Sequence, residues 1–545
     1  MFDSIIAGGQ IIDGTGKLRY RADLGINGDK ITAIGDLSGQ DAKKIISAEG
    51  KFVCPGFFDF HTHSDYSMLY DPRTPSRIYT GVTTQVIGNC GIGLVPIRDS
   101  RKDELLKYLQ TRIVGTINAP LILNWNTVDE YFAYIEKDPP AVNVAAYVAQ
   151  GPIRIDELGF RDGPATPEEL EHMKDEVVKA MKSGCIGLTT GLIYMPGAYT
   201  GKEELAELCK AMAPYGGYYC THMRDEGDAE MEALEEAIYI ASTGGVPLHV
   251  SHLKVMGAPN FGNIDKVFDR IHKAQADGLE VTYDCYPYTA GMTSLGALLP
   301  PWMFEGGVDN MLGRLEDPEI RKKSTRDILS GVPGWQDFYR MCGNFSNITI
   351  ASVYREENKS YEGRTVEELA REAGKDGFDF IYDLLVAENA KVQINVNVMS
   401  QTDVDKVVCD PETMFGSDSA DFATDGILNF GKPHPRAFGT VGHIFNHYVK
   451  ETGMLTFEQA VRKLTSLPAR RAGVGRERGT LQEGYFADIT VFDPRTIQDK
   501  ATYKDPKQYT VGVQTVLVNG QIALEDGRQI DEIRAGRILR HKTQA

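Results

Sequence analysis

The hydrophobic pattern divides the chain into a long central region and two shorter ends. In the central region, short apolar runs of β-type composition alternate with amphipathic stretches of helical length. The runs include residues 142–148, 217–220, 247–250 and 279–283, and the amphipathic stretches include 167–183, 202–213, 229–243 and 263–277. Strands that alternate with helices in this way predict a parallel sheet with helical crossovers. Because the unit recurs about eight times, we expect an α/β fold of the (β/α)8 barrel type, with its chemistry where the strands end.

The two ends of the chain have a hairpin-like pattern instead. Residues 22–26 and 30–34 flank Asn27-Gly28-Asp29, and a second Asn-Gly pair at 519–520 separates two more short runs. An Asn-Gly turn between alternating runs is a strong hairpin signal. The remaining runs of this kind are 4–7, 10–12, 487–492, 515–518 and 521–524. We therefore expect one small β-sandwich domain that is formed by both chain termini.

The change of pattern sets the expected domain boundaries. Residues 1–54 and 476–545 would form the β-sandwich, and residues 55–475 would form the barrel. Residues from about 296 to 344 interrupt the alternation with proline and charged residues. We expect this segment to be an insertion over the barrel mouth.

Composition and charge exclude several classes of partner. A chain of 545 residues that is 42% hydrophobic suits one large barrel with a smaller module. A net charge of −18 argues against nucleic acid as a partner, and an anionic substrate would need a local cluster of lysine and arginine. No apolar stretch of about 18 residues is present, so we expect no membrane span. The eight scattered cysteines include no CxxC pair and the N-terminus has no signal-peptide pattern, which favours reduced thiols and a cytoplasmic location.

The strongest chemical signal is the segment Phe58-Asp59-Phe60-His61-Thr62-His63. It ends an apolar run, and because side chains along a strand alternate between faces, the two histidines would point the same way. Two neutral imidazoles on one face can share a divalent metal. An isolated His-x-His also occurs by chance, so its meaning depends on the other candidates.

Three further candidate ligands, Cys90, His222 and His252, each follow a predicted strand. The glycines that flank Asn89-Cys90 indicate tight backbone geometry. Taken singly, Cys90 reads as a small buried hydrophobic residue and each histidine as a hydrogen-bonded core residue. Beside a dication, however, a thiol would be deprotonated and become a ligand. Ligand types at four strand ends of one chain favour a metal site.

Asp418, in Gly416-Ser417-Asp418-Ser419, is the candidate for proton transfer. A carboxylate at a late strand end, close to a metal-activated water, can accept its proton and later return it. An isolated aspartate in such a segment would read as a turn residue. The metal context favours the catalytic interpretation.

These motifs carry a resemblance to a known family. Pro55-Gly56-Phe57 before the His-x-His segment resembles the amidohydrolase superfamily. With Gly88-Asn89-Cys90-Gly91, the chain is similar to the N-acyl-D-amino-acid deacylase (D-aminoacylase) family, in which this cysteine stands where most relatives have a carbamylated lysine or a glutamate. The likeness extends from the N-terminal strands to residues 479–488.

The resemblance implies a metal-dependent amidohydrolase that cleaves linear N-acyl-D-amino acids to a carboxylate and a free D-amino acid. Cys90, His222 and His252 would hold a tightly bound zinc ion. His61 and His63 would frame a second, weaker metal position.

The resemblance also implies how the substrate is handled. Asp418 would be the general base and acid. The residues expected to grip the α-carboxylate and polarise the scissile carbonyl are Tyr194, Lys254, Tyr286 and Arg436. The expected partner is a small N-acylated amino acid. The number of subunits is left open, and a homo-oligomer is one possibility.

Three departures from the family pattern, Gln150, Met292 and Ser419, fall on loops expected to face the substrate. They predict preserved chemistry with an altered acyl or side-chain pocket.

Two alternative functions remain open at the level of sequence. One is a cyclic amide hydrolase related to hydantoinase or dihydroorotase, which usually needs a bridging lysine carbamate. The other is an amidohydrolase-fold binding protein that has lost catalysis.

Overall fold

A closed ring of parallel strands forms the centre of the protein, which the computed structural model describes over residues 1–112 and 117–542. Its strands are β6 (Phe57–Asp59), β7 (Val82–Ile87), β8 (Asn143–Ala146), β9 (Val148–Ala149), β10 (Gly187–Gly191), β11 (Tyr218–His222), β12 (Leu248–Val250), β13 (Val281–Cys285) and β17 (Met414–Phe415). Neighbours pair in parallel from β6 to β8 and from β9 round to β17. The Tyr147 N–H donates to the Ile87 carbonyl at 3.0 Å, which continues β8 into β9, and the Phe60 N–H donates to the Phe415 carbonyl at 3.2 Å, which closes the ring. The predicted (β/α)8 barrel is confirmed.

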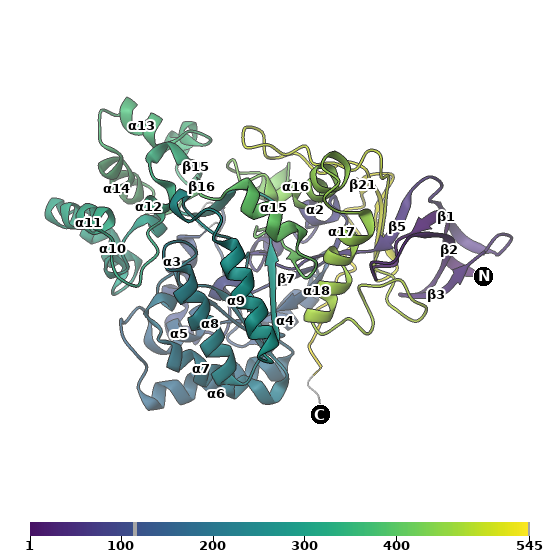
Figure 1. The fold of residues 1–545 in the computed structure, drawn as a ribbon, viewed down its shortest axis with the longest axis horizontal. Helices are drawn as coiled ribbons and strands as arrows, with labels where there is room; N and C mark the ends of the chain where they lie inside the picture. The colour runs from purple at the N-terminus through teal and green to yellow at the C-terminus, as the bar shows by residue number, and fades with distance from the viewer. Residues whose placement is uncertain (113–116, 543–545) are drawn as a thin grey trace.

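Amphipathic helices surround the barrel (Figure 1). They include α4 (Val128–Lys137), α5 (Gln150–Leu158), α6 (Pro167–Ser183), α7 (Lys202–Met212), α8 (Glu230–Gly244), α9 (Ile264–Ala276), α15 (Gln401–Cys409), α16 (Arg436–His443), α17 (Phe457–Leu464) and α18 (Ser466–Arg471). Helix α6 spans the predicted residues because its end signals are local: Thr166 and Glu169 form a capping box, and Gly184 ends the helix in the left-handed conformation. Among the described residues, no helix has both the length and the apolar character needed to cross a membrane.

Both chain termini contribute to one nine-stranded sheet, which agrees with the expected union of the two ends in a small β domain, predicted as a sandwich. Its strands are β1 (Phe2–Ile11), β2 (Tyr20–Asn27), β3 (Lys30–Gly35), β4 (Ala42–Ser47), β5 (Phe52–Pro55), β18 (Ile489–Phe492), β19 (Val513–Val518), β20 (Gln521–Glu525) and β21 (Arg528–Gln529). The order is β21-β20-β19-β18-β5-β1-β2-β3, with β4 beside β1, and the antiparallel β5–β18 pair joins the two halves. The predicted run 4–7 and residues 10 and 11 of the run 10–12 belong to the single strand β1, in which a register shift between Ile6 and Gly9 breaks the alternation. In Figure 1 the N-terminal strands lie beside the C-terminal part of the chain.

An inserted unit lies between barrel strands β13 and β17. It contains the strands β14 (Ala290–Ser294), β15 (Ile348–Val353) and β16 (Val392–Asn397) and the helices α10 (Val308–Leu315), α11 (Pro318–Ser330), α12 (Phe338–Cys342), α13 (Val366–Glu372) and α14 (Gly377–Ala387). The strands form an antiparallel sheet in the order β14-β16-β15. Residues 296–344, the expected insertion, hold α10 to α12, and the sheet strands lie on either side of that segment. The unit projects from one side of the barrel (Figure 1), and its residues Met292 and Val396 line the cavity at the barrel mouth.

Candidate active site

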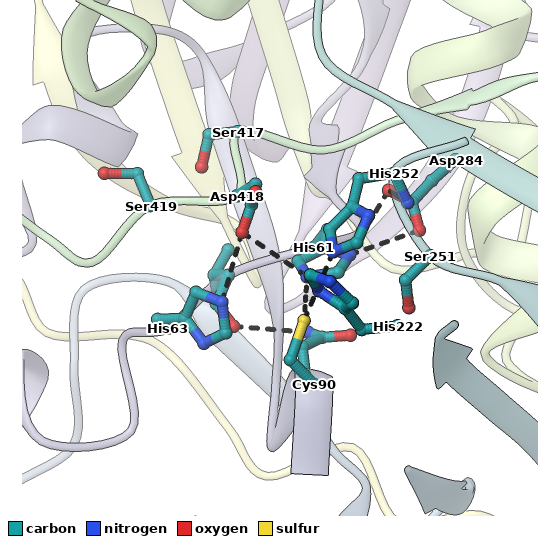
Figure 2. A network of polar contacts seen from close by, with 12 residues as sticks. His61, His63, Cys90, His222, Ser251, His252, Asp284, Ser417, Asp418 and Ser419 are labelled. Carbon is teal, nitrogen blue, oxygen red and sulfur yellow. Dashed lines mark hydrogen bonds and ion pairs between the residues drawn. The ribbon is translucent and has the colours of Figure 1, made fainter. Parts of the chain in front are cut away.

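The predicted ligands and base meet at the carboxyl ends of the barrel strands (Figure 2). His61 follows β6, and Cys90 lies in a short 3-10 turn after β7. His222 is the last residue of β11, His252 lies just beyond β12, and Asp418 lies just beyond β17. Because all parallel strands of a barrel end at the same rim, residues far apart in the sequence come together there.

The sulfur of Cys90 lies between two imidazoles. Its Sγ is 3.3 Å from His61 Nε2 and 3.4 Å from His252 Nε2. Asp418 Oδ1 is 3.6 Å from the same nitrogen of His61. One donor atom from each of these four buried or nearly buried residues lies within 4.8 Å of the others. The group can therefore converge on a single cation.

Three of these residues have a left-handed backbone. The φ angles are 53° for Cys90, 35° for His252 and 49° for Asp418. Non-glycine residues adopt positive φ at an energetic cost, and such positions concentrate at functional sites. For Cys90 the neighbouring glycines of the sequence motif, Gly88 and Gly91, also have positive φ, so the tight geometry expected there is present.

A second group of candidate ligands joins His222 and His252 through Glu226. Glu226 Oε2 lies 3.4 Å from His222 Nε2, and Glu226 Oε1 lies 3.0 Å from His252 Nδ1. The same Oε1 accepts a hydrogen bond from Lys254 Nζ at 2.7 Å. Burial raises the pKa of Glu226, but His222, Lys254 and His252 outweigh it and hold that pKa far below the usual value. Glu226 is thus an ionised carboxylate at the edge of the cluster.

The side chains fit a bound zinc ion. Thiolate, imidazole and carboxylate are the ligand types that zinc prefers. Both ring nitrogens of His222 are buried and have no hydrogen-bond partner of good geometry among the described residues, although buried polar groups are normally paired. Burial lowers the pKa of His222 well below its usual value, so the ring is neutral, as a metal ligand must be. Burial also raises the pKa of the Cys90 thiol well above its usual range, and a neighbouring divalent cation would favour its thiolate.

Asp284, at the end of β13, contacts residues of the cluster without belonging to the proposed ligands. One carboxylate oxygen accepts the backbone N–H of His252 at 3.0 Å, and the other lies 2.8 Å from His249 Nε2 and 3.3 Å from His61 Nδ1. Although burial raises the pKa of Asp284, the two histidines hold it far below its usual value. Carboxylates in this position fix the orientation of metal-binding histidines. Sequence reasoning missed both Asp284 and Glu226; the only signal for Glu226 is its place four residues after His222.

Asp418 lies between a histidine and an arginine. Its Oδ1 is 3.1 Å from His63 Nε2, and its Oδ2 pairs with Arg436 Nη1 at 2.9 Å. His61 and His63, which we expected at one metal position, both approach Asp418 Oδ1, at 3.6 Å and 3.1 Å, and His61 also lies against the Cys90 sulfur.

Arg77, which sequence reasoning also missed, holds the loop that carries Asp418. The guanidinium is almost fully buried and pairs with Asp59 at 2.8 Å and with Asp421 at 2.9 Å. It also donates to the Ser419 carbonyl at 2.7 Å and to Ser417 Oγ at 3.0 Å. Both immediate neighbours of Asp418 are thus tied to one cation.

The four residues expected to contact substrate border the same cavity. Tyr194 packs against His222 with ring centroids 5.3 Å apart, and its hydroxyl lies 3.2 Å from Thr293 Oγ1. The Arg436 guanidinium lies over the Tyr286 ring at 4.5 Å. The cavity lining includes Tyr194, Lys254, Tyr286 and Arg436. Lys254 and Arg436 therefore border the cavity, each paired with a carboxylate, Glu226 and Asp418 respectively.

Two of the three departures from the family pattern also border this cavity. Met292 and Ser419 are among its lining residues. Gln150 is buried, and its Nε2 donates to Thr200 Oγ1 at 2.9 Å.

The fold and the site together define a class of protein. A (β/α)8 barrel whose rim gathers imidazoles, a thiol and a carboxylate around one point is a metal-dependent hydrolase of the amidohydrolase kind. The family comparison agrees, because the Amidohydrolase family model matches residues 44–295 and 349–524.

Three similar proteins indicate to which branch of the amidohydrolase family the chain belongs. The chain is 35% identical to the D-aminoacylase of Alcaligenes xylosoxydans xylosoxydans over 99% of its own length and 97% of that protein. It is 31% identical, with a TM-score of 0.81, to the structure of N-acyl-D-glutamate deacylase from Bordetella bronchiseptica complexed with zinc and a phosphonate inhibitor, with 99% of both chains covered. It is 33% identical, with a TM-score of 0.80, to a structure of D-aminoacylase with a binuclear metal centre that shows one-metal activation and second-metal attenuation, with 99% of this chain and 100% of that one covered. The chain therefore belongs to the amidohydrolase family, in its D-aminoacylase branch.

Proposed function

We propose that the protein is a zinc-dependent N-acyl-D-amino-acid deacylase. The reaction adds water across the amide bond of a linear N-acyl-D-amino acid and releases a carboxylate and a free D-amino acid. The observation that carries the proposal is the Cys90 sulfur, 3.3 Å and 3.4 Å from the imidazole nitrogens of His61 and His252. A cysteine in this place supports a D-aminoacylase rather than a cyclic amide hydrolase, which usually relies on a lysine carbamate.

In this proposal Cys90, His222 and His252 hold the tightly bound zinc ion. His61 and His63 frame the second, weaker position, which is in keeping with the one-metal activation of the D-aminoacylase relative. Bound zinc supplies Lewis acidity, which polarises a carbonyl and makes water a stronger nucleophile at neutral pH. Glu226 and Asp284 orient the ligand histidines.

Asp418 acts as general base and then as general acid. Burial raises its pKa, but Arg436 and His63 outweigh that effect and hold the pKa of Asp418 well below its usual range. The carboxylate is therefore ionised and accepts the proton that the attacking water releases. Asp418 then donates this proton to the amide nitrogen as the C–N bond breaks, so that the amine leaves in neutral form.

The cationic and phenolic side chains bind the substrate. Arg436 presents a planar fork that matches a carboxylate, and Lys254 adds a point charge. Lys254 and Arg436 each already pair with a carboxylate, Glu226 at 2.7 Å and Asp418 at 2.9 Å, so the substrate contacts the donors that these pairs leave available. The Tyr286 hydroxyl donates to the oxygen that becomes negative as the carbonyl is attacked.

A substrate panel with controlled metal content tests the proposal. The purified protein is depleted with a chelator, reloaded with zinc, and assayed against N-acetyl-D-amino acids, their L-enantiomers, hydantoin and dihydroorotate. We expect release of free amino acid from the D-series only, and only after zinc is restored. Turnover of the cyclic substrates alone would contradict the proposal, and a zinc-loaded protein inert toward the whole panel would favour a binding protein.

The proposed partner is therefore a small N-acylated amino acid. The cytoplasmic location expected from the cysteines and the possible homo-oligomer stay predictions.

A further inference from the structure

The cavity beside Asp418 has two lobes of different character. Both are bordered by His63, Tyr194, Met292, Thr293 and Asp418. One lobe contains the proposed zinc ligands and has apolar walls from Met256, Phe338, Val396 and Val398. The other lobe contains two arginines, and its additional lining residues are Tyr66, Ile92, Arg112, Ser294, Gln393, Ser419, Ala420 and Arg436. Apart from Arg436, the proposed function gives these polar residues no task.

Arg112 is the charged residue of the second lobe that the proposed function does not use. Its Nε is buried and has no hydrogen-bond partner among the described residues, and within residues 1–112 and 117–542 no carboxylate lies within ion-pair distance of its guanidinium. Its one polar side-chain contact there is Nη2 with the Tyr108 hydroxyl at 3.2 Å. Arg436, in contrast, pairs with Asp418. Arg112 is partly buried, and an unpaired buried Nε with no anion beside it carries a desolvation cost that an anionic ligand offsets.

The guanidinium of Arg112 is held in place at the cavity wall. Its Cζ lies 3.9 Å from the centroid of the Tyr194 ring, a cation–π contact with a residue that both lobes share. The Arg112 N–H donates to the Leu109 carbonyl at 2.8 Å, at the end of α3 (Lys102–Gln110). Gln393, from strand β16 of the inserted unit, donates to the Thr111 carbonyl at 3.1 Å. Arg112 therefore lies at the C-terminal end of α3, which a strand of the inserted sheet contacts.

We propose that Arg112 is the anchor of a subsite for a second carboxylate of the substrate, separate from the α-carboxylate. The inference rests on the proposed function and extends it to a class of substrate. A planar guanidinium with free donors recognises a carboxylate in two-point fashion, and the hydroxyls of Thr293 and Ser294 in the same lobe add further donors. The second carboxylate is carried either by an acidic side chain of the D-amino acid or by a dicarboxylic acyl group. Both present the same chemistry to Arg112.

Matched pairs of substrates test the subsite in the zinc-loaded, full-length protein. For the side-chain arm, N-acetyl-D-glutamate is compared with N-acetyl-D-glutamine. For the acyl arm, N-succinyl-D-leucine is compared with its N-succinamoyl analogue. Each pair is assayed with the wild type, Arg112→Met, Arg112→Lys and the control Arg101→Met, which removes a partly exposed arginine at the start of α3 that pairs with Glu104.

We expect kcat/KM of the wild type to favour the charged member of one pair by about tenfold or more, because a site built for a polar group discriminates strongly against a substrate that lacks it. Arg112→Met should abolish that preference with little effect on the neutral member. Arg112→Lys should keep part of it, and Arg101→Met all of it. Thermal unfolding of each variant shows that it is folded.

Two results would overturn the subsite: no preference for a charged member in either pair, or an equal loss on charged and neutral members in Arg112→Met. If linear D-amides are hydrolysed in either case, the proposed function survives without the subsite. If the zinc-loaded wild type hydrolyses no linear D-amide, the proposed function fails and the subsite fails with it.

Discussion

Glu226 Oε1 lies 3.0 Å from His252 Nδ1, while the other nitrogen of the same ring, Nε2, faces the Cys90 sulfur at 3.4 Å. One imidazole therefore links a buried carboxylate to the proposed zinc position. A carboxylate on the outer nitrogen of a ligand histidine fixes the ring orientation and makes the inner nitrogen a stronger donor.

Glu226→Gln should weaken zinc binding by about 10- to 100-fold, because the amide keeps the shape of the side chain but loses its charge. Competition with a coloured chelator measures the affinity. Glu232→Gln, at an exposed position of α8, should bind zinc as the wild type does. An unchanged affinity in Glu226→Gln would show that Glu226 does not act through the metal.

Asp418→Asn should lower kcat by roughly 10²- to 10⁴-fold with no change in bound zinc, because the amide cannot take up the proton. Metal analysis and steady-state kinetics on the same sample separate the two effects. The exposed Asp425, in the same loop, gives the control Asp425→Asn, which should retain wild-type kcat. Full turnover in Asp418→Asn would refute the role of Asp418 as the base.

Arg77→Lys should lower kcat by about tenfold or more while KM and zinc content change little. Lysine cannot bind Asp59, Asp421 and the Ser419 carbonyl together, so the loop that carries Asp418 shifts, and small displacements of a reacting group are costly. Arg73→Lys, at a partly exposed position nearby, is the matched control. A kcat within about twofold of wild type in Arg77→Lys would show that Arg77 does not position the base.

The sequence predicts those features whose signals are local. Helix α6 matches its expected residues because a capping box and a C-terminal glycine mark its ends. The expected ligands lie close together because the carboxyl ends of all strands in a parallel barrel lie at the same rim. The inserted antiparallel sheet was not foreseen, since β14 and β15 are short strands separated by more than fifty residues, and only their common partner β16 brings them together.

The supporting carboxylates could not be predicted for a related reason. Glu226 and Asp284 carry no spacing that sets them apart from surface acids, and they become distinctive only when folding places them against the candidate ligands His222 and His61. The same holds for Arg112. Arg112 becomes a candidate binding residue only because folding places it over the Tyr194 ring, with no acid beside it in the described part of the chain.

Lys463 should make stability depend on pH. It is almost fully buried, its Nζ donates to the Val408 carbonyl at 2.6 Å, and burial lowers its pKa to about 8 from the usual 10.5. Between these two values the unfolded chain binds more protons than the folded chain, so the contribution of Lys463 to stability rises with pH. The melting temperature of the wild type relative to Lys463→Met should increase by about 2 °C from pH 7.5 to 9.5.

The neighbouring Arg462→Met is the control for this experiment, because arginine stays charged across the range and the difference should be flat. A difference for Lys463→Met that is equally flat, or that falls as the pH rises, would contradict the buried, partly neutral state of Lys463.

The central claim is that the Cys90 sulfur is a ligand of the catalytic zinc. Zinc X-ray absorption spectroscopy of the reloaded protein tests it most directly. The account predicts one sulfur scatterer at about 2.3 Å among nitrogen and oxygen ligands, which disappears in Cys90→Ser. A spectrum of the wild type with only nitrogen and oxygen scatterers at about 2.0–2.2 Å would contradict it.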